Sequence, residues 1–174
     1  AVWKQVHGLW DRAILSLAHD NPGLYAGTDQ GIYRSEDNGN TWESLDAGLE
    51  PSSGRALLIQ PLPPENPPGE QQSPQLQLPQ LIVGTEQGIA ALPLPAQRVE
   101  PVRWSRSNTG IVNSQILALA SSRDGTTIVA GTTAGVYRST SGGRTWDAWD
   151  DGLTQRFGPD KLRVPVVLAV PRGG

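Results

Sequence analysis

Two stretches of this chain repeat one pattern, and this repeat constrains the fold more than any other feature of the sequence. The first runs from Gly27 to Trp42 and the second from Gly131 to Trp146; both begin Gly-Thr-x-x-Gly-(Ile/Val)-Tyr-Arg-Ser and end Thr-Trp. A shortened copy, Gly-Thr-x-x-Gly-Ile, begins at Gly84. Such matches do not arise by chance in a chain this short, so we expect an architecture built from structural repeats.

Each repeat predicts a meander of short antiparallel strands. The polar residues between Gly27 and Gly31 separate two extended runs and indicate a tight hairpin, where glycine supplies backbone angles that other residues avoid. A second turn follows, in which Asp37 can accept hydrogen bonds from nearby N–H groups and Gly39 can take a left-handed conformation. The Trp that ends the repeat carries a large apolar surface, so we expect it to be buried.

The second turn of each full repeat matches the Asp-box pattern, Ser-x-Asp-x-Gly-x-Thr-Trp. In the first copy the motif residues are Ser35, Asp37, Gly39, Thr41 and Trp42. In the second copy they are Ser139, Ser141, Gly143, Thr145 and Trp146. A serine therefore stands at the aspartate position of the second copy, and its hydroxyl can cap the same turn more weakly.

This pattern resembles the BNR/Asp-box repeat family of β-propellers, and the resemblance covers nearly the whole chain. It implies that each box is a hairpin at the outer part of a blade, between the third and fourth strands. It also implies that the box residues staple a turn and take no part in catalysis. Photosystem II stability/assembly factors, sortilin-type propellers, sialidases and xyloglucan-cleaving propellers use the same repeat.

The repeat is about 40 residues long without its insert, which is the size of a four-stranded propeller blade. We therefore predict an all-β fold, a β-propeller fragment of about three four-stranded antiparallel blades with an orphan strand at each end. The predicted units are the outer strand of a preceding blade at 1–12, blade 1 at 13–50, blade 2 at 51–112, blade 3 at 113–153, and the inner strand of a following blade at 154–174. The run at 13–18 is apolar on both faces, as expected for an inner strand packed on both sides.

Blade 2 carries an insert at 61–80 that is rich in Pro, Gln and Glu. This composition predicts an exposed, extended loop without a core. Long loops on rigid scaffolds often bind partners, so this loop and the loops that enter the inner strands are candidate docking elements. The alternative for the insert is a tolerated insertion without a function.

The composition excludes several classes of function. The net charge is −3 and the basic residues are scattered, so there is no electrostatic basis for binding nucleic acid or anionic lipid. No apolar run approaches the roughly 20 residues of a membrane span. Cysteine is absent, and His7 and His19 share no ligand spacing with carboxylates, so we expect no metal and no cofactor. The chain starts at Ala1, as a chain does after signal-peptide removal, which favours an extracytoplasmic location (secreted, periplasmic or lumenal).

One short motif suggests an enzyme. The segment Leu162-Arg163-Val164-Pro165 resembles the Phe/Tyr-Arg-Ile-Pro motif of sialidase propellers, whose arginine grips the substrate carboxylate, so Arg163 is a candidate ligand contact. Val164 is equally explained by the inner-strand pattern. The carboxylate pair that glycoside hydrolysis requires has no convincing counterpart in the sequence.

The sequence favours a non-catalytic propeller scaffold that mediates protein–protein interaction or complex assembly over an enzyme. The alternatives are a fragment of an Asp-box glycoside hydrolase, sialidase- or xyloglucanase-like, and a carbohydrate-binding or adhesion propeller. The expected partners are proteins, or further blades that complete the ring, with carbohydrate as the alternative.

Overall fold

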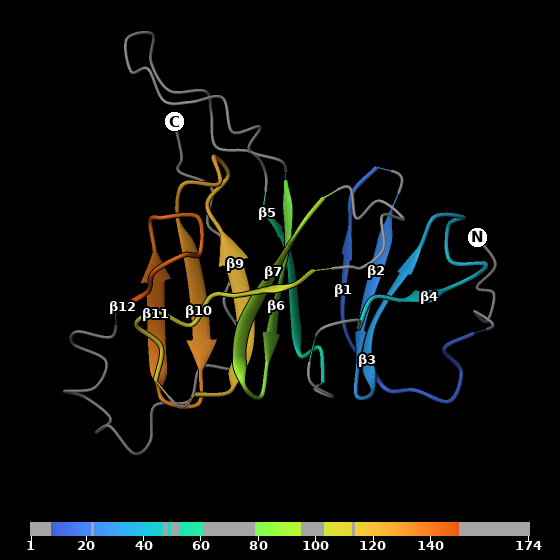
Figure 1. The fold of residues 1–174 in the computed structure, drawn as a ribbon, viewed down its shortest axis with the longest axis horizontal. Coiled ribbons are helices and arrows are strands. Elements are labelled where there is room, and N and C mark those ends of the chain that lie inside the picture. Colours follow the sequence, from blue (N-terminus) through green and yellow to red (C-terminus); the bar gives the residue numbers. More distant parts are fainter. Residues whose placement is uncertain are drawn as a thin grey trace, which may run out of the picture.

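Three four-stranded antiparallel sheets make up the part of the chain that the computed structural model describes, which is residues 8–21, 23–46, 49, 53–60, 79–94, 103–112 and 114–149 (Figure 1). We call the sheets blades 1, 2 and 3 in chain order. Blade 1 consists of β1 (Ile14–His19), β2 (Leu24–Thr28), β3 (Gly31–Ser35) and β4 (Glu43–Ser44). Blade 2 consists of β5 (Ala56–Gln60), β6 (Gln80–Thr85), β7 (Gly88–Pro93) and β8 (Ser105–Arg106). Blade 3 consists of β9 (Ile116–Ser121), β10 (Ile128–Thr132), β11 (Gly135–Ser139) and β12 (Asp147–Ala148). Within each sheet the strands lie in chain order.

The hairpin between the second and third strands has the same hydrogen bonds in every blade. In blade 1 the Thr28 hydroxyl accepts a hydrogen bond from the Gln30 N–H (3.1 Å) and donates one to the Gly31 carbonyl (2.9 Å). Thr85 and Thr132 make the equivalent two bonds in blades 2 and 3. Gly31 has a φ of +137°, a backbone angle that L side chains rarely adopt. The repeated Gly-Thr-x-x-Gly sequence therefore forms this hairpin through contacts that lie within the motif.

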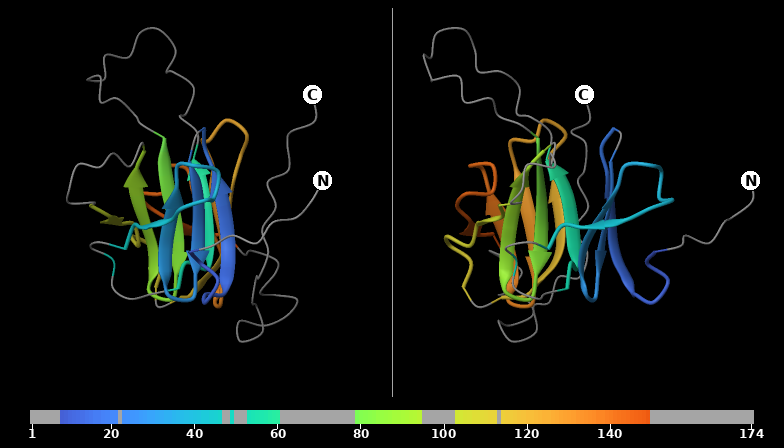
Figure 2. Two further views of the ribbon diagram at one scale, coloured as in Figure 1. Left: turned by 90° about the vertical axis from the view of Figure 1, so that its right-hand side faces the viewer. Right: turned by 45° about the vertical axis from the view of Figure 1, so that its right-hand side comes forward.

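The sheets pack face to face, with blade 2 between the other two (Figure 2). Strand β6 is apolar at successive positions because both of its faces are covered. Leu81 and Val83 belong to the core shared with blade 1, whereas Ile82 belongs to the core shared with blade 3. Successive side chains of a strand point to opposite faces, so a strand that is covered on both faces is apolar throughout.

The inner strands β1, β5 and β9 run next to one another, and here the blades approach most closely (Figure 1). A Cβ atom on Gly27 of β2 would lie only 2.1 Å from the carbonyl oxygen of Gly54, so only glycine fits between blades 1 and 2 at this point. The described residues confirm the predicted fold class, a β-propeller fragment of three four-stranded blades. The predicted orphan strands fall within 1–12 and 154–174; residues 1–7 and 154–174 lie outside the described residues, and residues 8–12 form bends and turns.

The inner strand of blade 1 differs from the prediction. We expected two-sided packing, but Ile14 is 45% exposed and Leu17 is 69% exposed. The equivalent of Ile14 in blade 3 is Ile116, which pairs with Thr132 as Ile14 pairs with Thr28 and is 0% exposed. The expectation is wrong for β1 because blade 2 covers the face of blade 3 on which Ile116 lies, and no described blade covers that face of blade 1.

Two other boundaries differ from the sequence patterns. The outer strand expected from Thr41 is only Glu43–Ser44 long, because the Thr41 N–H donates to Asp37 (2.8 Å) and not to β3. Gln80, which we placed in the insert, is the first residue of β6 and pairs with Gln60.

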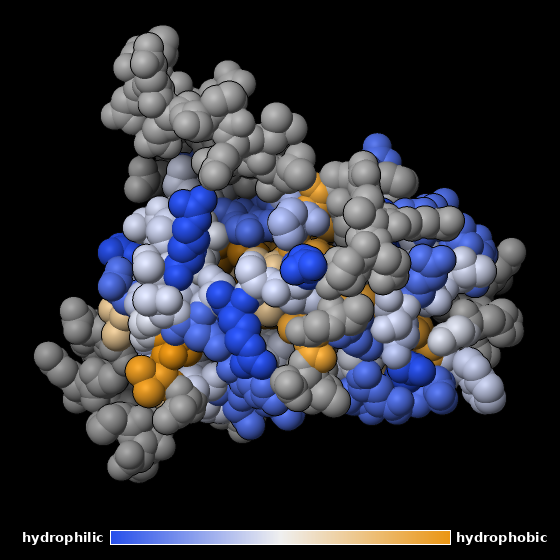
Figure 3. Space-filling view, in the orientation of Figure 1, coloured by the Kyte–Doolittle hydropathy of each residue, from blue (hydrophilic) through white to orange (hydrophobic). Residues whose placement is uncertain are grey.

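The surface of the described residues is mostly hydrophilic in the orientation of Figure 3, with hydrophobic residues visible in small separate patches. Among the residues that the structure describes, no helix has the length and apolar character of a membrane span.

Candidate functional site

The first Asp-box turn is a closed network of hydrogen bonds. The Ser35 hydroxyl accepts from the Gly39 N–H (2.8 Å) and donates to Asp37 Oδ1 (2.8 Å). The Asp37 carboxylate accepts from the Thr41 N–H (2.8 Å) and from the Thr41 hydroxyl (2.6 Å). The Trp42 Nε1 donates to the Gly39 carbonyl (3.1 Å). All five motif residues thus take part in one turn.

The second turn keeps this geometry with a serine in place of the aspartate. The Ser139 hydroxyl accepts from the Gly143 N–H (2.9 Å), and the Ser141 hydroxyl accepts from the Thr145 N–H (2.9 Å) and shares a 2.8 Å hydrogen bond with the Thr145 hydroxyl. Trp146 Nε1 donates to the Gly143 carbonyl (3.0 Å). Neutral hydrogen bonds here replace the charge-assisted ones of the first turn. That both boxes serve the fold alone stays a prediction.

Three carboxyl groups within the described ranges have lowered pKa values. The hydrogen bonds from the box threonine lower the pKa of Asp37 to about 2. A hydrogen bond from Ser122 contributes most to lowering the pKa of Asp124 to about 2, in the turn before β10. A hydrogen bond from Arg55 lowers the pKa of Glu86. A general acid requires a raised pKa, so these three groups are unsuited to donate a proton at neutral pH.

Side-chain oxygens of Asp46 and Asn108 accept hydrogen bonds from backbone N–H groups of the third strands of blades 1 and 2. Asp46 Oδ1 accepts a hydrogen bond from the Ile32 N–H (2.5 Å), and in blade 2 the amide oxygen of Asn108 accepts from the Ile89 N–H (2.7 Å). Sequence analysis did not single out these residues. The signal was their spacing, because each follows the tryptophan of its blade by four residues.

Tryptophan side chains also link neighbouring blades. Trp104 Nε1 in blade 2 donates to the Leu45 carbonyl of blade 1 (2.8 Å), and Trp146 Nε1 in blade 3 donates to the Ser107 carbonyl of blade 2 (3.0 Å). Each acceptor lies three residues after the tryptophan position of the preceding blade. The same inter-blade bond therefore occurs at both described junctions, and sequence analysis missed it because any residue provides a backbone carbonyl.

Two glutamines form a second link between blades 2 and 3. Gln60 Nε2 donates to the Gly125 carbonyl (3.0 Å), and Gln80 Nε2 donates to the Gly142 carbonyl (2.8 Å) within the second box turn. Gln80 also donates to the Gln60 side-chain oxygen. The first residue of β6 therefore holds the box turn of the next blade.

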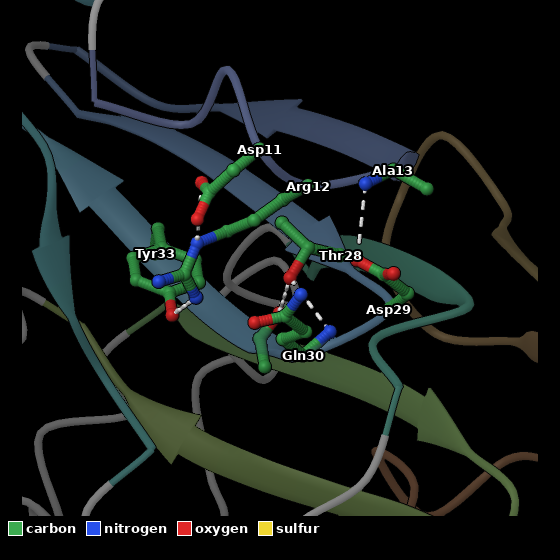
Figure 4. Close-up of polar contacts among 8 residues, drawn as sticks. Asp11, Arg12, Ala13, Thr28, Asp29, Gln30 and Tyr33 are labelled. Carbon is green, nitrogen blue, oxygen red and sulfur yellow. Dashed lines mark hydrogen bonds and ion pairs between the residues drawn. The ribbon is translucent and has the colours of Figure 1, made fainter.

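A polar cluster fixes the loop before β1 (Figure 4). The backbone N–H of Ala13 donates to Asp29 Oδ1 (3.0 Å), which ties this loop to the β2–β3 hairpin. The Arg12 guanidinium lies 4.5 Å from the centroid of the Tyr33 ring and hydrogen-bonds the Tyr33 hydroxyl. Arg12 Nε also lies 3.5 Å from the Asp11 carboxylate. A cation over an aromatic face is favourable, so Arg12 anchors the loop on blade 1.

An apolar groove of about 560 Å³ lies on the face of blade 1 that points away from blade 2. Residues of β1, of β2, of the first box turn and of the loop before β1 line this groove, among them Leu9, Ile14, Leu17, Leu24, Ala26 and Trp42. It can accept an apolar surface and offers few polar groups for chemistry.

The remaining predicted elements are not tested by these contacts. Arg163 and residues 61–78 of the insert lie outside the described residues. His19 is exposed at the end of β1. Within the described ranges, no three His, Cys, Asp or Glu side chains are close enough together to hold a metal ion.

No protein-family model matches this chain, and no curated protein sequence matches it. Solved structures with a similar fold include the extracellular domain of a putative one-component system from B. thetaiotaomicron, with a TM-score of 0.61 and 16% identity over 90% of this chain and 19% of that chain. The extracellular domain of a putative hybrid two-component system from the same organism has a TM-score of 0.50 and 19% identity over 72% of this chain and 14% of that chain. An ancestral GH74 enzyme has a TM-score of 0.52 and 14% identity over 78% of this chain and 18% of that chain. This chain thus spans at most 19% of each of these three chains, and at these identities the likeness concerns the fold alone.

Proposed function

We propose that this chain is part of an Asp-box β-propeller that acts as a non-catalytic scaffold for other proteins outside the cytoplasm. The observation that carries the proposal is the use of the carboxylates in the described blades. Asp37 and Asp124 hold turns, Asp29 and Asp46 cap backbone N–H groups, and Glu86 pairs with an arginine.

The location rests on one observation, which is that two of the similar structures are extracellular domains.

A glycoside hydrolase is the second candidate, and the similarity to a GH74 enzyme favours it. Glycoside hydrolysis requires a carboxylic acid with a raised pKa and a second carboxylate across the scissile bond. Hydrogen bonds instead lower the pKa of Asp37, Asp124 and Glu86, which favours the ionised state.

We place the binding surface of the scaffold on the 61–80 loop and on the loops that enter the inner strands. Gln60 precedes this loop and Gln80 is its last residue; both are held by hydrogen bonds to blade 3, so the loop starts and ends on a fixed base. A loop with anchored ends loses less entropy on binding than a free one.

Hydrolysis and binding assays on the natural protein that contains this chain test the proposal. We expect no release of sugar from xyloglucan, β-glucan or a sialoside above a heat-denatured control. We also expect in-cell cross-linking to yield one protein whose recombinant form binds with a Kd that weakens when residues 61–78 are replaced by a short Gly-Ser linker. Turnover that disappears when a carboxylate of this chain is replaced would refute the scaffold function and favour the hydrolase.

A further inference from the structure

The open face of blade 1 has the same residue positions that form the two described blade interfaces. Leu17 pairs with Ala26 in the first blade as Leu119 pairs with Ala130 in the third. Leu119 packs in the core between blades 2 and 3, whereas Leu17 is 69% exposed. The strand pairing also makes Ile14 of blade 1 the equivalent of Ile116 in blade 3. Ile116 is 0% exposed, whereas Ile14 is 45% exposed.

The tryptophan hydrogen bonds agree with this comparison. Trp146 Nε1 has two acceptors, the Gly143 carbonyl in its own turn and the Ser107 carbonyl of the preceding blade. Trp42 Nε1 has the first acceptor, the Gly39 carbonyl, and no described residue supplies the second. Among the described residues, blade 1 therefore lacks the bond that the indoles of blades 2 and 3 each donate to the preceding blade.

The chain enters blade 1 in the way that the end of one blade enters the next. Gly8 and Gly110 both have a positive φ, +114° and +97°. Gly110 borders Trp146, and a Cβ atom on Gly8 would lie 3.5 Å from Cδ1 of Trp42. The residues that follow, Leu9 and Ile111, are both buried. Residues 8 and 9 thus occupy the place that the end of a preceding blade would occupy.

We propose that the open face of blade 1 is a docking surface for a further β-blade of the same repeat, whose fourth strand leads into Gly8. In this arrangement Leu17 and Ile14 pack against the aliphatic side chains of that blade. The Trp42 Nε1 donates to a backbone carbonyl of the further blade, the one that lies three residues after the tryptophan position of that blade. Burial of this apolar face supplies the driving force, as it does at the two described junctions.

Gly8 and Leu9 already fill the space beside Trp42, which argues against a second copy of this chain as the occupant of the docking surface. If blade 3 of a second copy docked here, the residues that follow its β12 would need the same place beside Trp42. A blade that ends in Gly8 meets no such conflict. Docking of this blade is independent of whether the completed ring binds a protein or cleaves a glycan.

These 174 residues contain no cysteine, so a single thiol can be placed in the natural protein that contains this chain once any cysteine outside these residues is replaced by serine. Leu17→Cys reports on the docking surface, Leu119→Cys on the matched covered position, and Val112→Cys, at a site 69% exposed, on free access. We expect the thiol at position 17 to react with a maleimide at least about tenfold more slowly than the one at position 112, because a covered group reacts only when the structure opens locally. Equal rates at 17 and 112 would overturn the proposal.

A second measurement identifies the occupant and does not depend on the folding of any one variant. A photoactivatable cross-linker attached at position 17 is expected to capture a segment that lies before Gly8 in the ring. Capture of β10 or β11 from a second copy would overturn the proposal in favour of head-to-tail assembly.

The proposed hydrogen bond of Trp42 has its own test in the natural protein. Trp42→Phe keeps an aromatic ring and removes the indole N–H, so it should lower the unfolding temperature as much as Trp146→Phe. No shift would contradict the proposed hydrogen bond.

Discussion

The two box tryptophans occupy equivalent sequence positions and should contribute unequally to the stability of the 174-residue chain. Trp146 is 2% exposed in the core between blades 2 and 3 and donates to carbonyls in two blades. Trp42 is partly exposed on the open face of blade 1 and donates to one carbonyl in its own turn. We therefore predict that Trp146→Ala lowers the free energy of unfolding far more than Trp42→Ala.

The magnitudes follow from burial and from the hydrogen bonds. Trp146→Ala removes a fully buried aromatic ring and leaves a cavity, which costs about 3–5 kcal/mol. Trp42→Ala removes a ring that is already partly in water and leaves a smaller cavity, so we expect about 1–2 kcal/mol. Trp146→Phe keeps most of the buried apolar surface but leaves the Ser107 and Gly143 carbonyls without their donor, at about 1–3 kcal/mol.

Urea unfolding followed by far-UV circular dichroism measures these differences without relying on the fluorescence of six tryptophans. Trp10→Ala is the matched control, because Trp10 is 78% exposed and its loss should change stability by no more than about 0.5 kcal/mol. If Trp42→Ala cost as much as Trp146→Ala, the face of blade 1 would be covered in solution and our account of the isolated chain would be wrong. A cost below about 0.5 kcal/mol for Trp146→Phe would refute the inter-blade hydrogen bond.

Three further predictions test the turns and the close packing. Asp37→Ser should copy the neutral turn of blade 3 and lower the thermal unfolding midpoint at neutral pH. The pKa of Asp37 is about 2 in the folded protein against an ordinary value of 3.8, so its stabilisation is complete above the ordinary value and is lost as the pH falls toward 2. The acid loss of stability should therefore shrink in Asp37→Ser and grow in Ser141→Asp; an unchanged acid limb in both would contradict the turn electrostatics. Thr85→Val should cost about 1–3 kcal/mol in urea unfolding, because the buried Gly88 carbonyl and the part-buried Gln87 N–H lose their partner, and a neutral result would show that water replaces the hydroxyl. Gly27→Ala should cost about 1–3 kcal/mol in calorimetry, because its Cβ would overlap the Gly54 carbonyl at 2.1 Å; an unchanged midpoint would mean that the inner strands separate easily.

The hairpins and box turns could be read from the sequence because their partners lie close by in the chain. Thr28 bonds to groups two and three residues away, and Asp37 bonds to groups within four residues. Turn chemistry of this kind depends on residue type and spacing. The repeat then predicted the number of strands and blades, which the three sheets confirm.

Only the tertiary structure decided which equivalent residues are buried and how the blades are joined. Trp42 and Trp146 have the same local sequence, yet one lies on an open face and the other in a core, because burial depends on the neighbouring blade and not on the motif. The acceptors of the inter-blade bonds are the backbone carbonyls of Leu45 and Ser107, and every residue type has such a carbonyl. Glutamine is common in the insert, so the residue type does not set Gln80 apart. Its hydrogen bond to the third blade forms only when segments that are distant in the sequence meet.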